Sequence, residues 1–191
     1  MATIERTAYP RIQTPDALEL KQRYALQQNE IELAQKRTRG NTQLLTFCVL
    51  LKTFQQLGYF ARLDVLPKVI SITVREQLKA EFDKDADDKW PSIDPLFVSK
   101  PTLYAYQAVI RRHLGVRAFD ALVLNGLKAE IVKAAQIMND TAELINVGIE
   151  WLIKERYELP GYSTLDRLAV HVKATVNHDL FKKVYESLPS P

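Results

Sequence analysis

The feature that most constrains this chain is an apolar run in its first third. Between Thr42 and Gly58 the run contains Leu44, Leu45, Phe47, Cys48, Val49, Leu50 and Leu51. A helix that begins at Thr42 and ends at a Gly58 in the C′ position would be apolar on almost every side there, and such a helix is buried. The run therefore predicts a helix over about 42–57 at the centre of a helical lobe.

Cap and breaker residues predict helices along the rest of the chain. Thr14 followed by Pro15 and Asp16 opens a helix to about residue 27, and Asn29 with Glu32 opens another to about residue 38. Further helices are predicted at about 67–80, 102–114, 118–138, 140–157 and 163–188, with Asn125-Gly126 as an interruption. Sustained period-two alternation is missing, so the predicted fold class is all-α.

The predicted helices fall into two basic lobes joined by an acidic, proline-containing segment. Lys and Arg number 12 against 7 Asp and Glu in residues 1–80, 2 against 6 in 81–99, and 12 against 10 in 100–191. We expect a first lobe at 1–80, a linker at 81–100 and a second lobe at 101–191, with the linker pinned to a lobe by Trp90, Ile93, Leu96 and Phe97. Basic lobes suit a polyanionic partner. The acidic segment is predicted to be a solvated linker, with repulsion of wrong DNA phosphates as the alternative.

Several classes of protein are disfavoured by what the sequence lacks. Cys48 lies in the apolar run, which is typical of a core residue rather than a nucleophile, and one cysteine suits a reducing cytoplasm. His113, His171 and His178 have no further ligand placed to complete a zinc site, and no phosphate-binding glycine loop occurs. No apolar stretch is long enough for a membrane span, and no signal peptide opens the chain. We expect no cofactor, no metal, no membrane partner and no enzymatic activity.

The last predicted helix carries the most informative pattern. Its apolar stripe, which would face the core, consists of Leu165, Leu168, Ala169, Val172 and Val176. Its opposite face holds Ser163, Arg167, Val170, His171, Ala174 and Asn177. This face is polar at its start and small in its middle, which is the profile that a helix needs in order to enter a DNA major groove.

Together with the preceding helix, this pattern predicts a helix-turn-helix with a slightly long turn at Pro160-Gly161. Candidate phosphate contacts are Lys154 and Arg156 before the turn and Tyr162, Ser163 and Thr164 after it. Arg167 and His171 lie where base edges would be read, and Arg167 could make a bidentate contact to guanine. The alternative is an ordinary pair of amphipathic helices in which Arg167 pairs with Asp166 or Glu158.

Two weaker DNA-binding candidates lie earlier in the chain. Arg37 and Arg39 end one predicted helix beside Asn41 and Gln43 at the start of the next, an arrangement that can bind an anion. The alternative is a basic turn that only complements the helix dipole. Tyr104 and Arg111, with Tyr106 and Arg112, form the second candidate, which could equally be an interface or core.

The chain also resembles a known family through motifs in a fixed order. These are Glu5-Arg6, Tyr9-Pro10-Arg11, Leu50-Leu51-Lys52-Thr53-Phe54-Gln55, Leu57-Gly58-Tyr59-Phe60, Arg111-Arg112-His113-Leu114-Gly115-Val116, Leu144-Ile145-Asn146, Tyr157-Glu158-Leu159-Pro160 and Ser163-Thr164-Leu165-Asp166-Arg167-Leu168-Ala169. They make it similar to the N-terminal region of the transposases of Tn-three-type replicative transposons. The acidic stretch at 81–89 matches no family motif.

This resemblance implies sequence-specific binding of double-stranded DNA at the terminal inverted repeats of a transposon, for DNA transposition. Such transposases carry their metal-dependent acidic catalytic site in a later RNase-H-like domain, and nothing in this chain matches that part. The implied partners are the transposon end and the remaining domains of a transposase, with room for a homodimer in the full assembly, in a bacterial cytoplasm and on the nucleoid when DNA-bound. The alternative is a helical protein-interaction module of a transposase assembly, or a stand-alone regulator of transposition.

Overall fold

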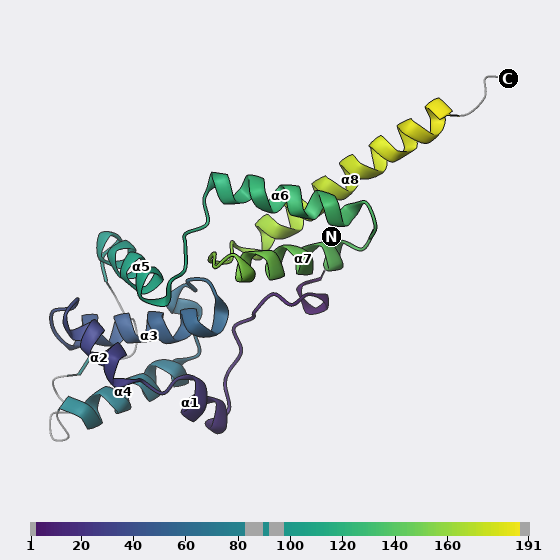
Figure 1. Cartoon of the computed structure of the whole chain (residues 1–191). Coiled ribbons are helices and arrows are strands. Elements are labelled where there is room, and N and C mark those ends of the chain that lie inside the picture. The colour runs from purple at the N-terminus through teal and green to yellow at the C-terminus, as the bar shows by residue number, and fades with distance from the viewer. Residues whose placement is uncertain (1–2, 83–89, 92–97, 188–191) are drawn as a thin grey trace. The chain divides into compact units, whose positions relative to one another are not determined.

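The computed structural model describes residues 3–82, 90–91 and 98–187, and it is all-α over these residues, as predicted. Extended pairing among them is limited to one bridge, between Arg117 and Tyr157. Two compact units are present: Pro10–Leu114, and a second unit that combines Met1–Tyr9 with Gly115–Pro191. We call these the first unit and the C-terminal unit; Figure 1 shows their elements along the chain.

The first unit is built around α3. Its helices are α1 (Ala17–Arg23), α2 (Gln28–Gln35), α3 (Asn41–Leu57), α4 (Lys68–Phe82) and α5 (Lys100–Leu114), with a 3-10 turn at Leu63–Val65. Helix α3 contacts α2, α4 and α5 (Figure 1). Every residue from Leu44 to Phe54 is buried, and Gly58 ends the helix in the left-handed conformation with φ 71°. The predicted buried central helix is therefore confirmed.

Helices α1 and α2 are capped by residues other than the predicted ones. Helix α1 is capped by Asp16, whose side chain accepts the backbone N–H groups of Leu18 and Glu19, rather than by Thr14. Helix α2 is capped at Gln27, and Glu30 rather than Glu32 reaches back to the cap residue, at 2.9 Å from the Gln27 nitrogen. The reason for the second difference lies outside the helix, because Glu30 is also held by α3.

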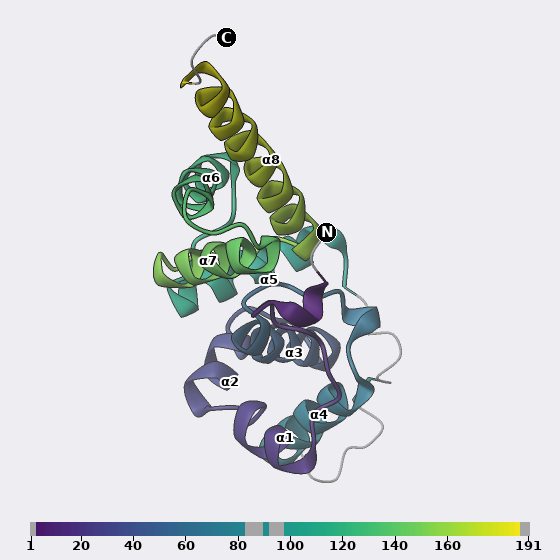
Figure 2. The ribbon, with the colours of Figure 1, turned by 90° about the vertical axis from the view of Figure 1, so that its right-hand side faces the viewer.

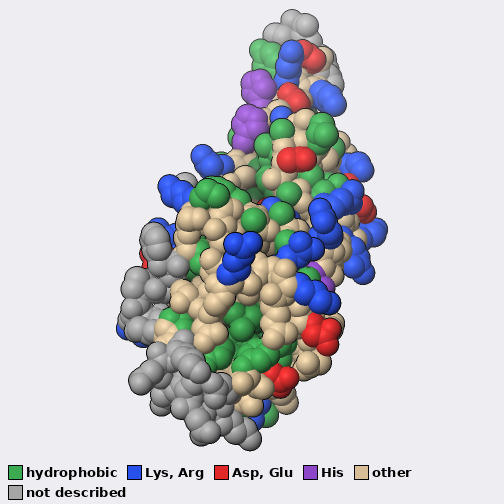
Figure 3. Space-filling model, turned by 90° about the vertical axis from the view of Figure 1, so that its left-hand side faces the viewer, with side chains coloured by type: hydrophobic (Ala, Val, Ile, Leu, Met, Phe, Trp, Pro, Cys, Tyr) green, Lys and Arg blue, Asp and Glu red, His purple; other side chains and the backbone are tan. Residues whose placement is uncertain are grey.

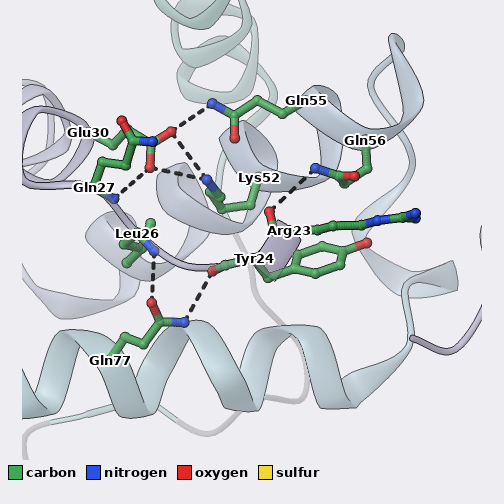
Figure 4. A network of polar contacts seen from close by, with 9 residues as sticks. All are labelled: Arg23, Tyr24, Leu26, Gln27, Glu30, Lys52, Gln55, Gln56 and Gln77. Atoms are coloured by element: carbon green, nitrogen blue, oxygen red, sulfur yellow. Dashed lines mark hydrogen bonds and ion pairs between the residues drawn. The ribbon is translucent and has the colours of Figure 1, made fainter. Parts of the chain in front are cut away.

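Glu30 is the centre of a buried polar network that joins α2 to α3 (Figure 4). Both of its carboxylate oxygens lie within 3.3 Å of Lys52 Nζ, and Gln55 Nε2 donates to Oε1 at 2.6 Å. The side chains of Glu30 and Lys52 are 3% and 6% exposed. Nearby, Gln77 of α4 accepts the N–H of Leu26 and donates to the carbonyl of Tyr24. The network fixes the short α1–α2 connection and α2 onto the unit's core.

The C-terminal unit packs three helices on one another: α6 (Ala121–Ala135), α7 (Thr141–Lys154) and α8 (Tyr162–Ser187) (Figure 2). Leu144, Leu152, Leu165 and Val172 are buried here, as Phe47, Leu51 and Phe54 are in the first unit. The apolar run predicted this for Phe47 and Leu51, and the apolar stripe of the last helix predicted it for Leu165 and Val172. Asp140 caps α7 as expected, and its side chain accepts the N–H of Ala142 at 2.7 Å.

Asn125-Gly126 does not interrupt the structure, because α6 runs straight through it. Gly126 instead allows α7 to approach closely: a Cβ at this position would lie 3.0 Å from Cη2 of Trp151. Gly148 has the same role on α7, where a Cβ would meet Leu127 Cδ1 at 3.1 Å. The glycine at position 126 therefore allows a close helix–helix contact and does not break the helix.

The unit boundaries differ from the predicted lobes of 1–80 and 101–191. Helix α5 belongs to the first unit, where Tyr106 packs edge-on against Phe47 at a centroid distance of 5.3 Å. Residues 1–9 belong to the C-terminal unit. Most of the predicted linker at 81–100, with Ile93, Leu96 and Phe97, lies outside the described residues, whereas Trp90 is described and buried.

A search of the described helices for one long and apolar enough to cross a bilayer found none.

Candidate nucleic-acid interface

The strongest candidate site is the connection between α7 and α8. Helix α7 ends at Lys154 and α8 begins at Tyr162, so residues 155–161 form the turn. Lys154 and Arg156 are exposed there, as expected for phosphate contacts. Arg156 has φ 56°, and it is the only non-glycine residue with positive φ in the described part of the chain. A side chain is strained in this conformation, which occurs at helix C-termini mostly with glycine.

Arg117 holds the turn between α7 and α8 in place through several hydrogen bonds. Its backbone N–H donates to the carbonyl of Arg156 at 2.8 Å, and its own carbonyl accepts the N–H of Glu158 at 2.9 Å. Its guanidinium donates to the carbonyl of Glu155 at 2.7 Å and lies 4.0 Å from the centroid of the Tyr157 ring. Arg117 therefore satisfies a carbonyl at the end of α7 and fixes the path of the following chain. No local sequence pattern predicts this role, because the first of its partners, Glu155, lies 38 residues further on.

Helix α8 presents the two faces predicted for it. Leu165, Ala169 and Val172 are buried and Leu168 and Val176 are half-buried, whereas Ser163, Arg167, Val170, His171 and Ala174 are exposed. Asn177 is half-buried, and its side-chain amide donates to Asn139 Oδ1 at 3.4 Å. The outward face thus has a polar first turn, followed by Val170, His171 and the small Ala174.

Arg167 makes a local contact at the start of this face. Its Nε donates to the carbonyl of Ser163 at 3.1 Å, and the side chain is solvent-exposed. Asp166, one of the two acidic residues considered as its partner, is buried. Ser163 itself lies inside the first turn of α8 rather than capping it, because the helix begins one residue earlier, at Tyr162.

Tyr162 and Thr164 are less accessible than the rest of the first turn. Both are half-buried, and the N–H of Thr164 donates to the carbonyl of Gly161 at 2.8 Å. The ring of Tyr162 packs edge-on against Tyr9, with 5.6 Å between centroids. Burial raises the pKa of the Tyr162 hydroxyl, and the carboxylates of Asp166 and Glu5 raise it further. The negative surroundings make Tyr162 the least suited of the predicted residues to contact a phosphate.

The turn between α2 and α3 is the second candidate. Arg37 and Arg39 are exposed, and Asn41 and Gln43 are half-buried. Gln43 Oε1 accepts both the N–H of Arg39, at 2.9 Å, and the hydroxyl of Tyr106, at 3.2 Å. Gln43 thus holds the turn against α5. At this end of α3 the accessible residues are Asn41, Thr42 and Gln43, and the helix is buried from Leu44 to Phe54.

The two predicted DNA-binding residues on α5, Tyr104 and Arg111, differ in exposure. Tyr104 is exposed, whereas Arg111 is half-buried with its guanidinium 5.4 Å from the centroid of the Phe60 ring. An Arg stacked on an aromatic ring contributes to packing as well as to charge. Arg111 therefore holds α5 to the segment that follows α3.

Groups of Lys and Arg side chains stand on the face of the molecule drawn in Figure 3, with fewer acidic side chains between them. In the residues that the structure describes, no three His, Cys, Asp or Glu side chains gather as a metal site would require. Burial raises the pKa of the Cys48 thiol to about 12; the charge of Glu30 adds to the rise and that of Lys52 opposes it. A thiol in this environment is a core group.

The sequence was also compared with known proteins. A search of curated proteins found no match. A protein family does match, over residues 1–172, which is most of the chain. The chain belongs to the family described as "Domain of unknown function (DUF4158)".

Proposed function

We propose that this chain binds double-stranded DNA sequence-specifically and recognises the terminal inverted repeats of a transposon. The observation that carries the proposal is the outward face of α8, where exposed Ser163 and Arg167 precede the small Ala174. A helix can bring its N-terminal residues to base edges only if no bulky side chain holds it out of the major groove. The family of the chain is associated with Tn-three-type transposases, which supports the same conclusion.

The assigned roles follow from exposure and position. Arg167 reads a base, with His171 one turn further along the same face. Lys154 and Arg156 bind backbone phosphates from the end of α7. The α2–α3 turn, through Arg37 and Arg39, supplies a second contact region. The partners are a transposon end and the remaining domains of a transposase in the bacterial cytoplasm, and the chain itself performs no chemistry.

A second candidate function, a protein-interaction module, is favoured by the far end of α8. This helix has 26 residues, so it is about 39 Å long. Its last turns expose apolar side chains, above all Phe181 at 75% and Tyr185 at 79%. Figures 1 and 2 show this end of α8 running past α6 and α7. Exposed aromatic side chains are typical of surfaces that bind another protein.

Salt dependence distinguishes the two functions. A protein that neutralises phosphates loses affinity with a log–log slope of about −0.9 per contact, whereas an apolar interface is nearly indifferent to salt. We expect Lys154→Ala to weaken binding to all DNA sequences alike and to shrink the slope by about one unit. Lys182→Ala is the matched control, because it removes the same charge from α8 at about 30 Å from the start of that helix. Equal effects of the two substitutions would contradict the assignment of Lys154.

A further inference from the structure

The first residues of the chain form a strap across the C-terminal unit. Arg6 pairs with Asp140, the cap of α7, at 2.6 Å. The N–H of Ala8 donates to Asn146 Oδ1, on α7, at 2.7 Å. Tyr9 then reaches the turn between α7 and α8, where its hydroxyl donates to the carbonyl of Pro160 at 2.9 Å. The strap thus follows α7 from its beginning to the turn that precedes α8.

Tyr9 is the buried anchor of this strap. It is 6% exposed, whereas Arg6 and Ala8 are solvent-exposed. Its ring packs edge-on against Tyr162, the first residue of α8, at an interplanar angle of 69°. One side chain therefore touches both the last part of the turn and the first residue of the candidate recognition helix.

The contact of Tyr9 with the α7–α8 turn joins residues that are far apart in the sequence. The first unit, Pro10–Leu114, is inserted between the strap and the rest of the C-terminal unit, so Tyr9 and Pro160 are 151 residues apart in sequence. Helix α8 also packs on α6 and α7, and its residues Leu165, Ala169 and Val172 are buried. What the strap adds is a fixed position for the turn and for the first turn of α8.

We propose that Tyr9 is a positioning residue for DNA recognition, which holds the first turn of α8 where Arg167 can reach a base. The proposal rests on the proposed function. Base readout depends on geometry, because a bidentate contact forms only if the guanidinium meets the base edge in the correct place. Phosphate contacts by flexible basic side chains tolerate a small displacement. Loss of the Tyr9 anchor therefore reduces specific binding and leaves non-specific binding intact.

The test uses Tyr9→Phe in the full chain. This substitution keeps the ring on Tyr162 and removes the hydroxyl bond to Pro160. We expect affinity for the recognised sequence to fall about threefold to tenfold, as for the loss of one hydrogen bond, and affinity for unrelated DNA to stay within about twofold. Hydrogen exchange should speed up at the amides of residues 157–164, which include Tyr157, Glu158 and Thr164, and not in α3.

The control is Ile131→Val, which removes one buried methyl group from α6 away from the turn. It should lower the melting temperature without changing the ratio of specific to non-specific affinity. If the parent binds DNA specifically and Tyr9→Phe binds with the same ratio, the positioning role is wrong and the proposed function stands. If the parent shows no specific binding, the proposed function falls and the positioning role falls with it, while the exchange rates still report whether Tyr9 holds the turn.

Discussion

Arg156 should be a residue whose replacement by glycine makes the protein more stable and worse at binding DNA. Its φ of 56° costs about 1–2 kcal/mol for a residue with a Cβ. Glycine removes this cost but loses about 0.5–1 kcal/mol through the greater freedom of the unfolded chain. The net gain in the free energy of unfolding is therefore about 0–1.5 kcal/mol, with a central value of about 0.75 kcal/mol. For a unit of this size the central value corresponds to a rise of about 3–6 °C in melting temperature.

The same substitution removes an exposed guanidinium from the α7–α8 turn. If Arg156 binds a phosphate, Arg156→Gly should reduce affinity for all DNA sequences and shrink the salt slope by about one unit. Strain that persists at an exposed Arg is expected where the side chain has a function.

Arg156→Ala is the matched control, because it removes the same charge and keeps the positive φ. It should lose binding as the glycine variant does without gaining stability. Thermal unfolding and fluorescence anisotropy on labelled duplexes measure both quantities. The reasoning is refuted if Arg156→Gly unfolds at or below the melting temperature of Arg156→Ala, or if both variants bind as the parent does.

Three further predictions concern the first unit and the whole chain. Lys52→Met leaves the Glu30 carboxylate buried without its ion-pair partner, so urea unfolding should show a loss of about 3 kcal/mol in the free energy of unfolding. The double variant Glu30→Gln, Lys52→Met should recover part of this loss, whereas a loss below about 1 kcal/mol for the single variant would show that the pair contributes little. Cys48, with its pKa raised to about 12 by burial, should not react with a thiol reagent at pH 8 until the protein is unfolded in urea, and rapid labelling of the native protein would contradict its place in the core. A footprint on a transposon end should cover about two turns of duplex in two blocks, because basic residues are exposed in both units; a single short block would exclude the α2–α3 turn from the interface.

Local sequence patterns were sufficient for the helices and for the two faces of α8. The apolar run at 44–51 and the stripe that begins at Leu165 are each signals within one helix. The structure buries the whole run and, in the stripe, Leu165, Ala169 and Val172. The start of α2 was misplaced because Glu30 is fixed by Lys52 on another helix, which no local pattern reports. Gly126 was misread for the same reason, since its neighbour Trp151 comes from α7.

The candidate site was predictable only in part. Exposure of Lys154, Arg156 and Arg167 follows from helical periodicity and from the position of the turn. The residues that hold this turn in place are Arg117 and Tyr9, and both act across long stretches of sequence. Likewise, α5 joins the first unit through Tyr106 and Gln43, which are 63 residues apart. Contacts of this kind depend on the tertiary fold and produce no periodic pattern in the sequence.

The central claim is that α8 reads DNA through Arg167, and one paired measurement tests it most directly. Arg167→Ala and the parent are bound to a set of duplexes that differ at single base pairs, and their melting temperatures are recorded alongside. Because Arg167 is exposed and bonded only to the carbonyl of Ser163 among the contacts described above, the melting temperature should hardly change. Specific binding should weaken by about 1–3 kcal/mol, with preference relaxed at one base position. If Arg167→Ala discriminates among the duplexes as the parent does, the assignment of α8 as the recognition helix is wrong, and the α2–α3 turn around Arg39 becomes the better candidate.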